Sequence, residues 1–244
     1  MSQSGKDRAI ESKAMMPSPE VYEQEYQYWP WGTLIDKTAE LIQQKAGYSS
    51  FILEYMCGTG YLLNEISGRR PDLQLSGCSL TPEYIDYAHN KYPQLRIVLQ
   101  DALLYKPIGP PDVVICTAGL HHLTRRNQKL FIEKIASELA SGKLFLLGEE
   151  VIRPYADEQD RKLSVLELWT SLITFSVRRG ATEQVIRAAG TAMTNDLFEL
   201  GEYKLCLRDL VSLVRPYFLI ETVEKTWYDS SLQYGDVLLV CKRI

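Results

Sequence analysis

Two adjacent histidines, His121 and His122, are the residues of this chain best suited to proton transfer near neutral pH. An imidazole titrates near a pKa of about 6.5, so its neutral form can accept a proton from a substrate under physiological conditions. The chain has 3 histidines in all, so the pair is a concentrated feature. Two interpretations stay open: His121 is a general base, or the pair shapes the loop that carries it.

A glycine-rich segment, Gly58-Thr59-Gly60, is the second feature that indicates chemistry. It follows an apolar run at residues 51–55 and precedes a helical pattern through Leu63 and Ile66. Glycines at such a strand–turn–helix junction let a ligand approach backbone N–H groups at the positive end of the helix. A dinucleotide-binding fingerprint requires a third glycine at position 63, so Leu63 argues against NAD or FAD.

Two neighbouring carboxylates, Glu149 and Glu150, end an apolar segment that we predict to be a strand at residues 143–148. Ligands of open α/β sheets bind at the carboxyl ends of the strands, where one of these groups could accept a substrate proton. Adjacent residues of an extended chain point in opposite directions, so at most one should face a ligand. With 3 histidines and no clustered ligand spacing, we expect no metal.

Aromatic side chains crowd the segment before the first predicted helix; they are Tyr22, Tyr26, Tyr28, Trp29 and Trp31. Such a segment could close over a bound ligand as a lid. The alternative is that these rings anchor the N-terminal part of the chain to the surface of the domain.

The elements that position these residues alternate between extended and helical patterns, which indicates an α/β fold with a parallel sheet. The predicted strands lie at residues 51–55, 73–79, 95–99, 112–117 and 143–148. Residues 152–205 hold helical patterns only, and we interpret them as an inserted cap, with core packing or a dimer interface as alternatives. Extended segments at 218–227 and 235–242 predict an antiparallel hairpin with a turn at residues 229–231.

Composition limits the class of protein. The 244 residues carry 27 basic and 31 acidic side chains, a net charge of −4 with no basic block, so neither nucleic acid nor an anionic membrane surface is expected as a partner. The 5 cysteines are scattered without a CxxC pair, which indicates free thiols in a reducing, cytoplasmic setting. We expect a flexible arm at residues 1–18 and a single domain at 19–244.

The segment from Glu54 to Gly60, EYMCGTG, resembles the (D/E)-x-G-C-G-T-G loop of class I methyltransferases that use S-adenosylmethionine (SAM). Three further motifs occur in the order typical of that family; they are Gly77 to Pro82 (GCSLTP), Gln100 to Ala102 (QDA) and Asp112 to Leu123 (DVVICTAGLHHL). The terminal hairpin also matches. The resemblance implies a Rossmann-like fold with a seven-stranded, mostly parallel sheet, and a small organic molecule as substrate.

The resemblance also implies roles by position. Glu54, Gly58 and Gly60 would hold the methionine end of SAM, Asp101 and Ala102 would contact adenine, and Thr117 or Ala118 would line the sulfonium. The full set of cofactor positions is Glu54, Gly58, Thr59, Gly60, Ser79, Leu80, Asp101, Ala102, Thr117 and Ala118. In the resembling phosphobase methyltransferases a histidine at the place of His121 pairs with an N-terminal tyrosine, here Tyr26, and Glu149 completes the catalytic candidates.

Two residues depart from the family pattern. Met56 replaces the first glycine of the loop, and Ser79 replaces the acidic residue that normally holds the ribose hydroxyls. A serine hydroxyl is a weaker acceptor than a carboxylate, whose hydrogen bonds contribute about 1.5–3 kcal/mol each.

We therefore expect SAM-dependent methyl transfer to a small organic molecule, in specialised biosynthesis, with S-adenosylhomocysteine (SAH) as product. Two alternatives remain. The fold could perform cyclisation, decarboxylation or hydroxylation with SAM structural or absent, or the chain could be a non-catalytic binding subunit. A homodimer through the helical insertion is also open.

Overall fold

The computed structural model describes residues 16–228 and 231–244, and these residues build a seven-stranded mixed sheet with the strand order β3-β2-β1-β4-β5-β7-β6. The strands are β1 (Phe51–Tyr55), β2 (Gln74–Ser79), β3 (Arg96–Leu99), β4 (Val113–Thr117), β5 (Leu144–Val151), β6 (Phe218–Trp227) and β7 (Gly235–Arg243). The first five are parallel, whereas β7 pairs antiparallel with both β5 and β6. The α/β fold with its antiparallel hairpin is as the sequence predicts.

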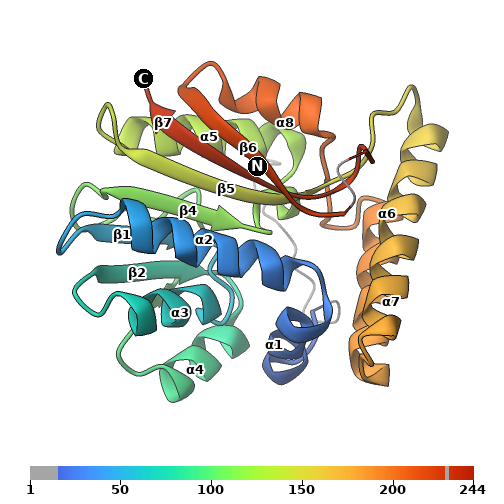
Figure 1. Ribbon diagram of the computed structural model, residues 1–244, viewed down its shortest axis with the longest axis horizontal. Coiled ribbons are helices and arrows are strands. Elements are labelled where there is room, and N and C mark those ends of the chain that lie inside the picture. Colours follow the sequence, from blue (N-terminus) through green and yellow to red (C-terminus); the bar gives the residue numbers. More distant parts are fainter. Residues whose placement is uncertain (1–15, 229–230) are drawn as a thin grey trace, which may run out of the picture.

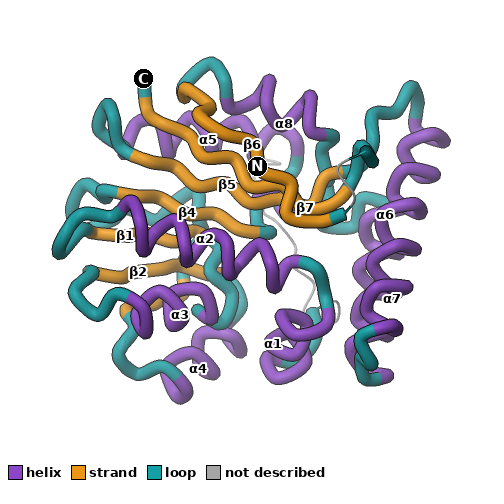
Figure 2. The backbone as a smooth tube through the Cα atoms, in the orientation of Figure 1, coloured by secondary structure: helices purple, strands orange, loops and turns teal. Residues whose placement is uncertain are grey.

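Helices cover both faces of the sheet (Figures 1 and 2). They are α1 (Pro19–Tyr28), α2 (Trp31–Lys45), α3 (Tyr61–Arg69), α4 (Pro82–Lys91), α5 (Arg125–Glu138), α6 (Glu158–Arg178), α7 (Glu183–Leu197) and α8 (Leu207–Val214). Alternation along β1 divides the core, because Ile52 packs with α2 and α3 while its neighbour Leu53 packs with α5 and α8. Both residues are fully buried.

The strand order reverses between β1 and β4, which lie side by side and are followed by helices on opposite faces. Open α/β sheets bind ligands in the crevice outside the carboxyl ends of the strands at such a point. The two loops that border it are the glycine segment after β1 and the segment from Thr117 to the short 3-10 helix η1 (Leu120–His122) after β4. The topology therefore brings the glycine loop and the histidine pair to one place.

Helices α6 and α7 stand beside the sheet at the edge where the parallel strands end, with α1 next to them (Figure 1). The side chain of Arg179 links the two regions, because its Nε donates a hydrogen bond to the carbonyl oxygen of Gln27 at 3.0 Å. The insertion thus reaches the aromatic N-terminal segment, as expected of a cap. Whether residues 19–244 behave as a single domain stays a prediction.

Three details differ from the sequence-based expectation. The aromatic segment is itself helical, since Ser18 accepts a hydrogen bond from the Val21 N–H and Pro19 occupies the first helical position. Strand β5 continues to Val151, so Glu149 lies within it rather than after it. Helix α6 begins at Glu158, where Asp157 provides the N-cap, earlier than the predicted start at 163.

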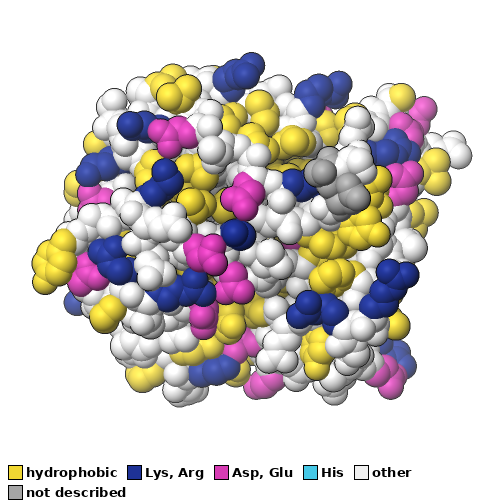
Figure 3. Space-filling model, in the orientation of Figure 1, with side chains coloured by type: hydrophobic (Ala, Val, Ile, Leu, Met, Phe, Trp, Pro, Cys, Tyr) yellow, Lys and Arg dark blue, Asp and Glu magenta, His cyan; other side chains and the backbone are white. Residues whose placement is uncertain are grey.

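Parts of two predictions lie outside the described residues: residues 1–15 of the expected arm and residues 229–230 of the hairpin turn. Among the residues that are described, no helix combines the length and apolar character needed to cross a bilayer. On the face that carries α2, Lys and Arg side chains alternate with Asp and Glu over the described surface (Figure 3). This mixture agrees with the weak net charge of −4.

Candidate functional site

The glycine loop after β1 adopts a backbone that favours glycine at two positions. The φ angles of Gly58 and Gly60 are +54° and +76°. A Cβ atom at Gly60 would lie 2.3 Å from Ile97 Cδ1, and one at Gly58 would lie 2.8 Å from the hydroxyl oxygen of Tyr22. Gly60 is therefore required for packing against β3, whereas Gly58 lets the Tyr22 side chain of α1 pack directly on the loop.

The departure at Met56 has a structural cost, because its φ angle is +56°. Left-handed backbone costs a residue other than glycine about 1–2 kcal/mol. The Met56 side chain lines a cavity above the loop, together with Ser79, the second departure from the family pattern. Both departures thus lie at the candidate site, where side-chain identity affects a ligand directly.

This space, the glycine-loop cavity, encloses about 600 Å³ and is partly open to solvent. It is lined by Met16, Tyr22, Met56, Gly58, Ser79, Leu80, Thr81, Tyr84, Gln100, Asp101, Ala102, Ala118, His122 and Leu123. Six of the expected cofactor residues are among them, namely Gly58, Ser79, Leu80, Asp101, Ala102 and Ala118. The other four, Glu54, Thr59, Gly60 and Thr117, are not among the lining residues. The loops after β1, β2, β3 and β4 thus meet at one cavity.

Glu54, the penultimate residue of β1, is buried with an incomplete set of hydrogen-bond partners. It is 3% exposed, its Oε1 accepts a long hydrogen bond of 3.4 Å from the Thr117 hydroxyl, and its Oε2 has no hydrogen-bond partner among the described residues. Burial raises the pKa of Glu54 to about 8, and the Thr117 hydroxyl offsets this only in part. A buried carboxyl with a free oxygen is prepared to receive a donor, above all a positively charged one.

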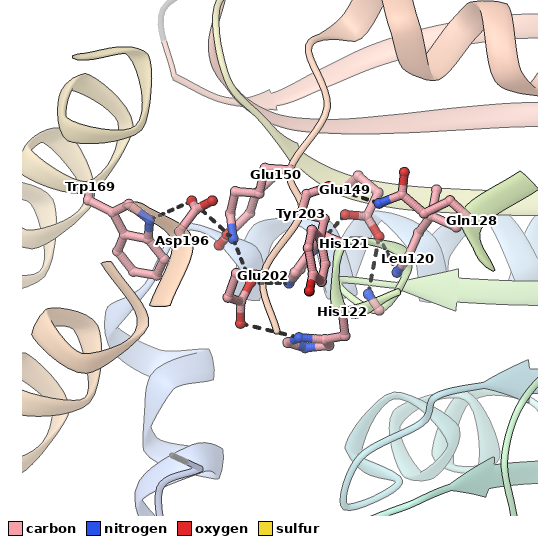
Figure 4. Close-up of polar contacts among 12 residues, drawn as sticks. Leu120, His121, His122, Gln128, Glu149, Glu150, Trp169, Asp196, Glu202 and Tyr203 are labelled. Carbon is pink, nitrogen blue, oxygen red and sulfur yellow. Dashed lines mark hydrogen bonds and ion pairs between the residues drawn. The ribbon is translucent and has the colours of Figure 1, made fainter. Parts of the chain in front are cut away.

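His121 is held by Glu149 on the neighbouring strand β5 (Figure 4). The Nδ1 atom of His121 lies 2.7 Å from Glu149 Oε2, and Glu149 Oε1 accepts the backbone N–H groups of Gly119 and Leu120 at 3.1 and 2.7 Å. A carboxylate so placed accepts a hydrogen bond, so Nδ1 carries a proton. Glu149 does not line the glycine-loop cavity. Its geometry suits it to orient His121 rather than to contact a substrate.

His122 and Glu202 complete a second set of contacts with His121. Glu202 Oε2 lies 3.4 Å from His121 Nε2, and Glu202 Oε1 lies 3.2 Å from His122 Nδ1. These three residues form a group whose spacing could hold a metal ion. Lys204, which lies 3.1 Å from Glu202 Oε2, already supplies a positive partner to this group, so we assign no metal and its absence stays a prediction.

Lys204 is a buried cation that the sequence did not reveal as a site residue. Its Nζ atom lies 3.1 Å from Glu202, 3.2 Å from Glu150 and 3.7 Å from Asp196. Burial alone would lower the pKa of Lys204, but these carboxylates raise it well above its usual value. Burial likewise opposes ionisation of Glu202, whereas Lys204 and the two histidines hold its pKa well below the usual range.

A second cavity adjoins the first and is named here the indole cavity, because three tryptophans line it. It encloses about 580 Å³ and is bordered by Met16, Pro17, Tyr22, Glu25, Trp29, Trp31, Ala118, His121, His122, Glu150, Trp169, Ala188, Ala192, Asn195, Glu202 and Lys204. It shares Met16, Tyr22, Ala118 and His122 with the glycine-loop cavity. The residues of α1, α6 and α7 therefore enclose a space that is continuous with the loop site.

Three sequence-based expectations need adjustment here. Tyr26 lines neither cavity, since its ring stacks on Tyr61 at 4.1 Å and on Trp31 at 4.7 Å between centroids. Tyr22, one helical turn earlier, is the tyrosine that faces both cavities. The sequence singled out His121 of the histidine pair, whereas in the structure His122 lines both cavities and His121 lines the indole cavity. Of the two strand carboxylates, Glu150 faces the indole cavity and Glu149 faces away.

A family model described as a methyltransferase domain matches residues 52–142, the stretch that contains β1 to α5 and both loops of the switch point. Residues 52–142 are thus similar to a methyltransferase domain. The glycine loop, Ser79, Asp101 and the histidine pair all lie within this matched segment. The residues that close the indole cavity, from α1, α6 and α7, lie outside it.

Two curated relatives are similar over a longer stretch. The carboxy-S-adenosyl-L-methionine synthase of Campylobacter fetus subsp. fetus is 27% identical over 163 residues, which is 64% of this chain and 67% of that protein. The protein of the same name from Campylobacter lari is 23% identical over 155 residues, 60% of this chain and 66% of that protein. The matches thus span about two thirds of each relative.

Solved structures agree in fold. The N-methyltransferase NodS of Bradyrhizobium japonicum, in complex with SAH, superimposes with a TM-score of 0.58 at 12% identity, covering 93% of this chain and 98% of that one. The magnesium protoporphyrin IX methyltransferase ChlM of Synechocystis, with bound SAH, gives 0.59 at 16% identity over 88% and 84%. At these identities the likeness shows the fold alone, and it extends beyond residues 52–142 to most of the described chain.

Proposed function

We propose that this protein transfers the methyl group of SAM to a small organic molecule, in a specialised biosynthetic reaction. The observation that carries this proposal is the meeting of two cavities at Ala118 and His122. One cavity rests on the glycine loop of the segment that matches a methyltransferase domain, and the other is an adjoining cavity lined by residues of α1, α6 and α7. A two-substrate transfer requires such adjoining sites, because catalysis depends largely on holding both reactants in line.

The residues of the glycine-loop cavity fit SAM. Gly58 lines this cavity beside Tyr22 and would border the methionine portion of SAM. The free oxygen of Glu54 suits the amino group of SAM, and Asp101 with Ala102 suits the adenine. Bound there, SAM supplies an electrophilic methyl group. Ser79 would contact the ribose, and Thr117 with Ala118 would border the sulfonium.

The acceptor would occupy the indole cavity, with His121 as its proton acceptor. With Nδ1 engaged by Glu149, the nitrogen that would take a substrate proton is Nε2, which lies 3.4 Å from Glu202 Oε2, and His121 lines this cavity. Glu149 acts as a positioning residue, because its oxygens are engaged by the imidazole and by two backbone N–H groups. The aromatic helix α1 separates the indole cavity from solvent on one side, in agreement with a lid role for the segment from Tyr22 to Trp31.

Product analysis tests the proposal. Purified protein is incubated with SAM that carries a deuterated methyl group and a panel of small amines, phenols and carboxylic acids, and the products are identified by mass spectrometry. The proposal requires SAH together with an acceptor that carries the label. Label that never leaves SAM, with calorimetry showing that SAM binds, would contradict methyl transfer. Absence of SAM binding would instead favour a non-catalytic subunit.

A second candidate is favoured by the curated relatives, which are named for making carboxy-S-adenosyl-L-methionine. In that case SAM itself would be the molecule that changes, by gaining a carboxyl group. The same mass spectra separate the two candidates, because carboxylated SAM keeps the adenosyl and methionine parts in one product, whereas methyl transfer releases SAH. The separate indole cavity is the feature that leads us to place methyl transfer first.

A further inference from the structure

The charge of the indole cavity is unbalanced. Three of its lining side chains, Glu25, Glu150 and Glu202, are acidic, whereas Lys204 supplies the basic group. Lys204 is already shared, because its ammonium lies 3.2 Å from Glu150, 3.1 Å from Glu202 and 3.7 Å from Asp196. Three carboxylates, those of Glu150, Glu202 and Asp196, therefore share this one ammonium group.

Glu25 lies in the same cavity but takes no part in the ion pairs of Lys204. It lies on α1, is 2% exposed, and its Oε1 is buried without a hydrogen-bond partner in the described part of the chain. Burying a carboxyl group without a partner is costly, and core packing alone gives no reason to keep it there. Burial, and then the nearby charge of Glu150, raise the pKa of Glu25 well above its usual value, so this group ionises most readily beside a positive partner.

Three indole rings surround the same space. Trp29 meets Trp169 edge to face with ring centroids 5.8 Å apart, and Trp29 and Trp31 lie 6.3 Å apart at an angle of 45°. Tryptophan faces attract cations within about 6 Å of the ring, more strongly when water is excluded. The protein already uses this contact, since the ammonium of Lys204 lies 5.2 Å from the centroid of Trp169.

We infer that the indole cavity binds a small organic amine in its cationic form, with Glu25 as the counter-ion and Trp29, Trp31 and Trp169 as the aromatic wall. This rests on the proposed function, because the amine would be the methyl acceptor. After loss of one proton to His121 Nε2, the amine nitrogen bonds the methyl carbon. The carbon–sulfur bond of SAM breaks with its electron pair on sulfur, which gives the methylated amine and SAH.

The experiment compares choline with 3,3-dimethylbutan-1-ol, a neutral molecule of the same shape, as probes of the full-length protein. Binding is followed by tryptophan fluorescence, since three of the 4 tryptophans line the cavity. We expect choline to bind at least about tenfold more tightly than the alcohol, because a cation–π contact and a charged partner together supply 1.4 kcal/mol or more. Comparable affinities for the two probes would overturn the inference.

Substitution then locates the effect. Glu25→Gln keeps the shape but removes the charge, so it should lower choline affinity about tenfold and leave the alcohol unchanged. Glu20→Gln is the matched control, since Glu20 lies exposed on the same helix, and it should leave both affinities unchanged. Equal loss for both probes in Glu25→Gln would contradict a charge role for Glu25. Calorimetry with SAM on the same samples separates the outcomes, because SAM binding without cation preference overturns only this inference.

Discussion

The Nδ1 atom of His121 lies 2.7 Å from Oε2 of Glu149, and this contact fixes which imidazole nitrogen faces the acceptor site. The partner oxygen of Glu149 is held by two backbone N–H groups of the loop after β4, so the carboxylate cannot easily rotate away. The imidazole is therefore held in one orientation before substrate arrives. The two predictions that follow from the chemistry of this site concern His121 and Glu54.

Replacing His121 by asparagine should lower kcat by about 10²–10⁴-fold, the usual contribution of a general base. Affinity for SAM should change little, because His121 lines the indole cavity and not the glycine-loop cavity. The matched control is His89→Asn, since His89 contacts the carbonyl oxygen of Ile97 and lines neither cavity. Steady-state kinetics and calorimetry check both variants. Full activity of His121→Asn would remove the proton-acceptor role, and loss of SAM binding would indicate a structural one.

Binding of SAM should release a proton from Glu54 at neutral pH. Burial raises the pKa of this carboxyl to about 8, so it is mostly protonated in the free protein at pH 7. Pairing with the amino group of SAM requires the ionised form. The affinity should therefore rise as the pH increases from about 6 to about 7.5, by up to tenfold per unit, and level off above the pKa.

Calorimetry in two buffers with different enthalpies of ionisation measures that proton directly. Glu54→Gln should bind SAM more weakly and show neither proton release nor this pH dependence. Wild-type binding that is independent of pH and of the buffer would show that Glu54 does not meet the cofactor.

Much of the arrangement can be predicted from local sequence. Alternation assigns Ile52 and Leu53 to opposite faces of β1, and the glycines at 58 and 60 occupy the positive-φ positions that such a loop requires. The strand at 218–227 has the predicted bounds, which lie between Pro216 and a polar stretch of sequence. These features depend on neighbours within a few residues, which a sequence shows plainly.

The rest depends on contacts between distant segments. Lys204 becomes a site residue only because the chain after α7 returns to β5. No local sequence pattern predicts this return. Tyr22 and Tyr26 are four residues apart on one helix, so composition cannot tell which faces the cavity. Ser18 and Pro19, an N-cap residue followed by a proline at the first helical position, predict the start of helix α1. The many aromatic side chains of the segment indicate a lid or an anchor instead and say little about its secondary structure.

Replacing Ser79 by aspartate should tighten SAM binding about fivefold, a gain on the order of 1 kcal/mol. Ser79 lines the glycine-loop cavity at the end of β2, so a carboxylate there can accept hydrogen bonds from the ribose hydroxyls. Calorimetric titration of the variant and the wild type gives the two Kd values. A clear loss of affinity would mean that the ribose lies elsewhere or that Asp101 already serves it.

The measurement that tests the central claim most directly is a calorimetric titration of SAM into wild-type protein, Gly58→Val and Gly68→Val. The valine at 58 would project toward the Tyr22 hydroxyl, whereas an added Cβ at Gly68 meets nothing within 4 Å among the described residues. We predict binding to the wild type and to Gly68→Val, and none to Gly58→Val, while circular dichroism stays native for all three. Gly58→Ala should weaken binding in the same direction. Unchanged SAM affinity in a folded Gly58→Val protein would contradict the assignment of this cavity to SAM.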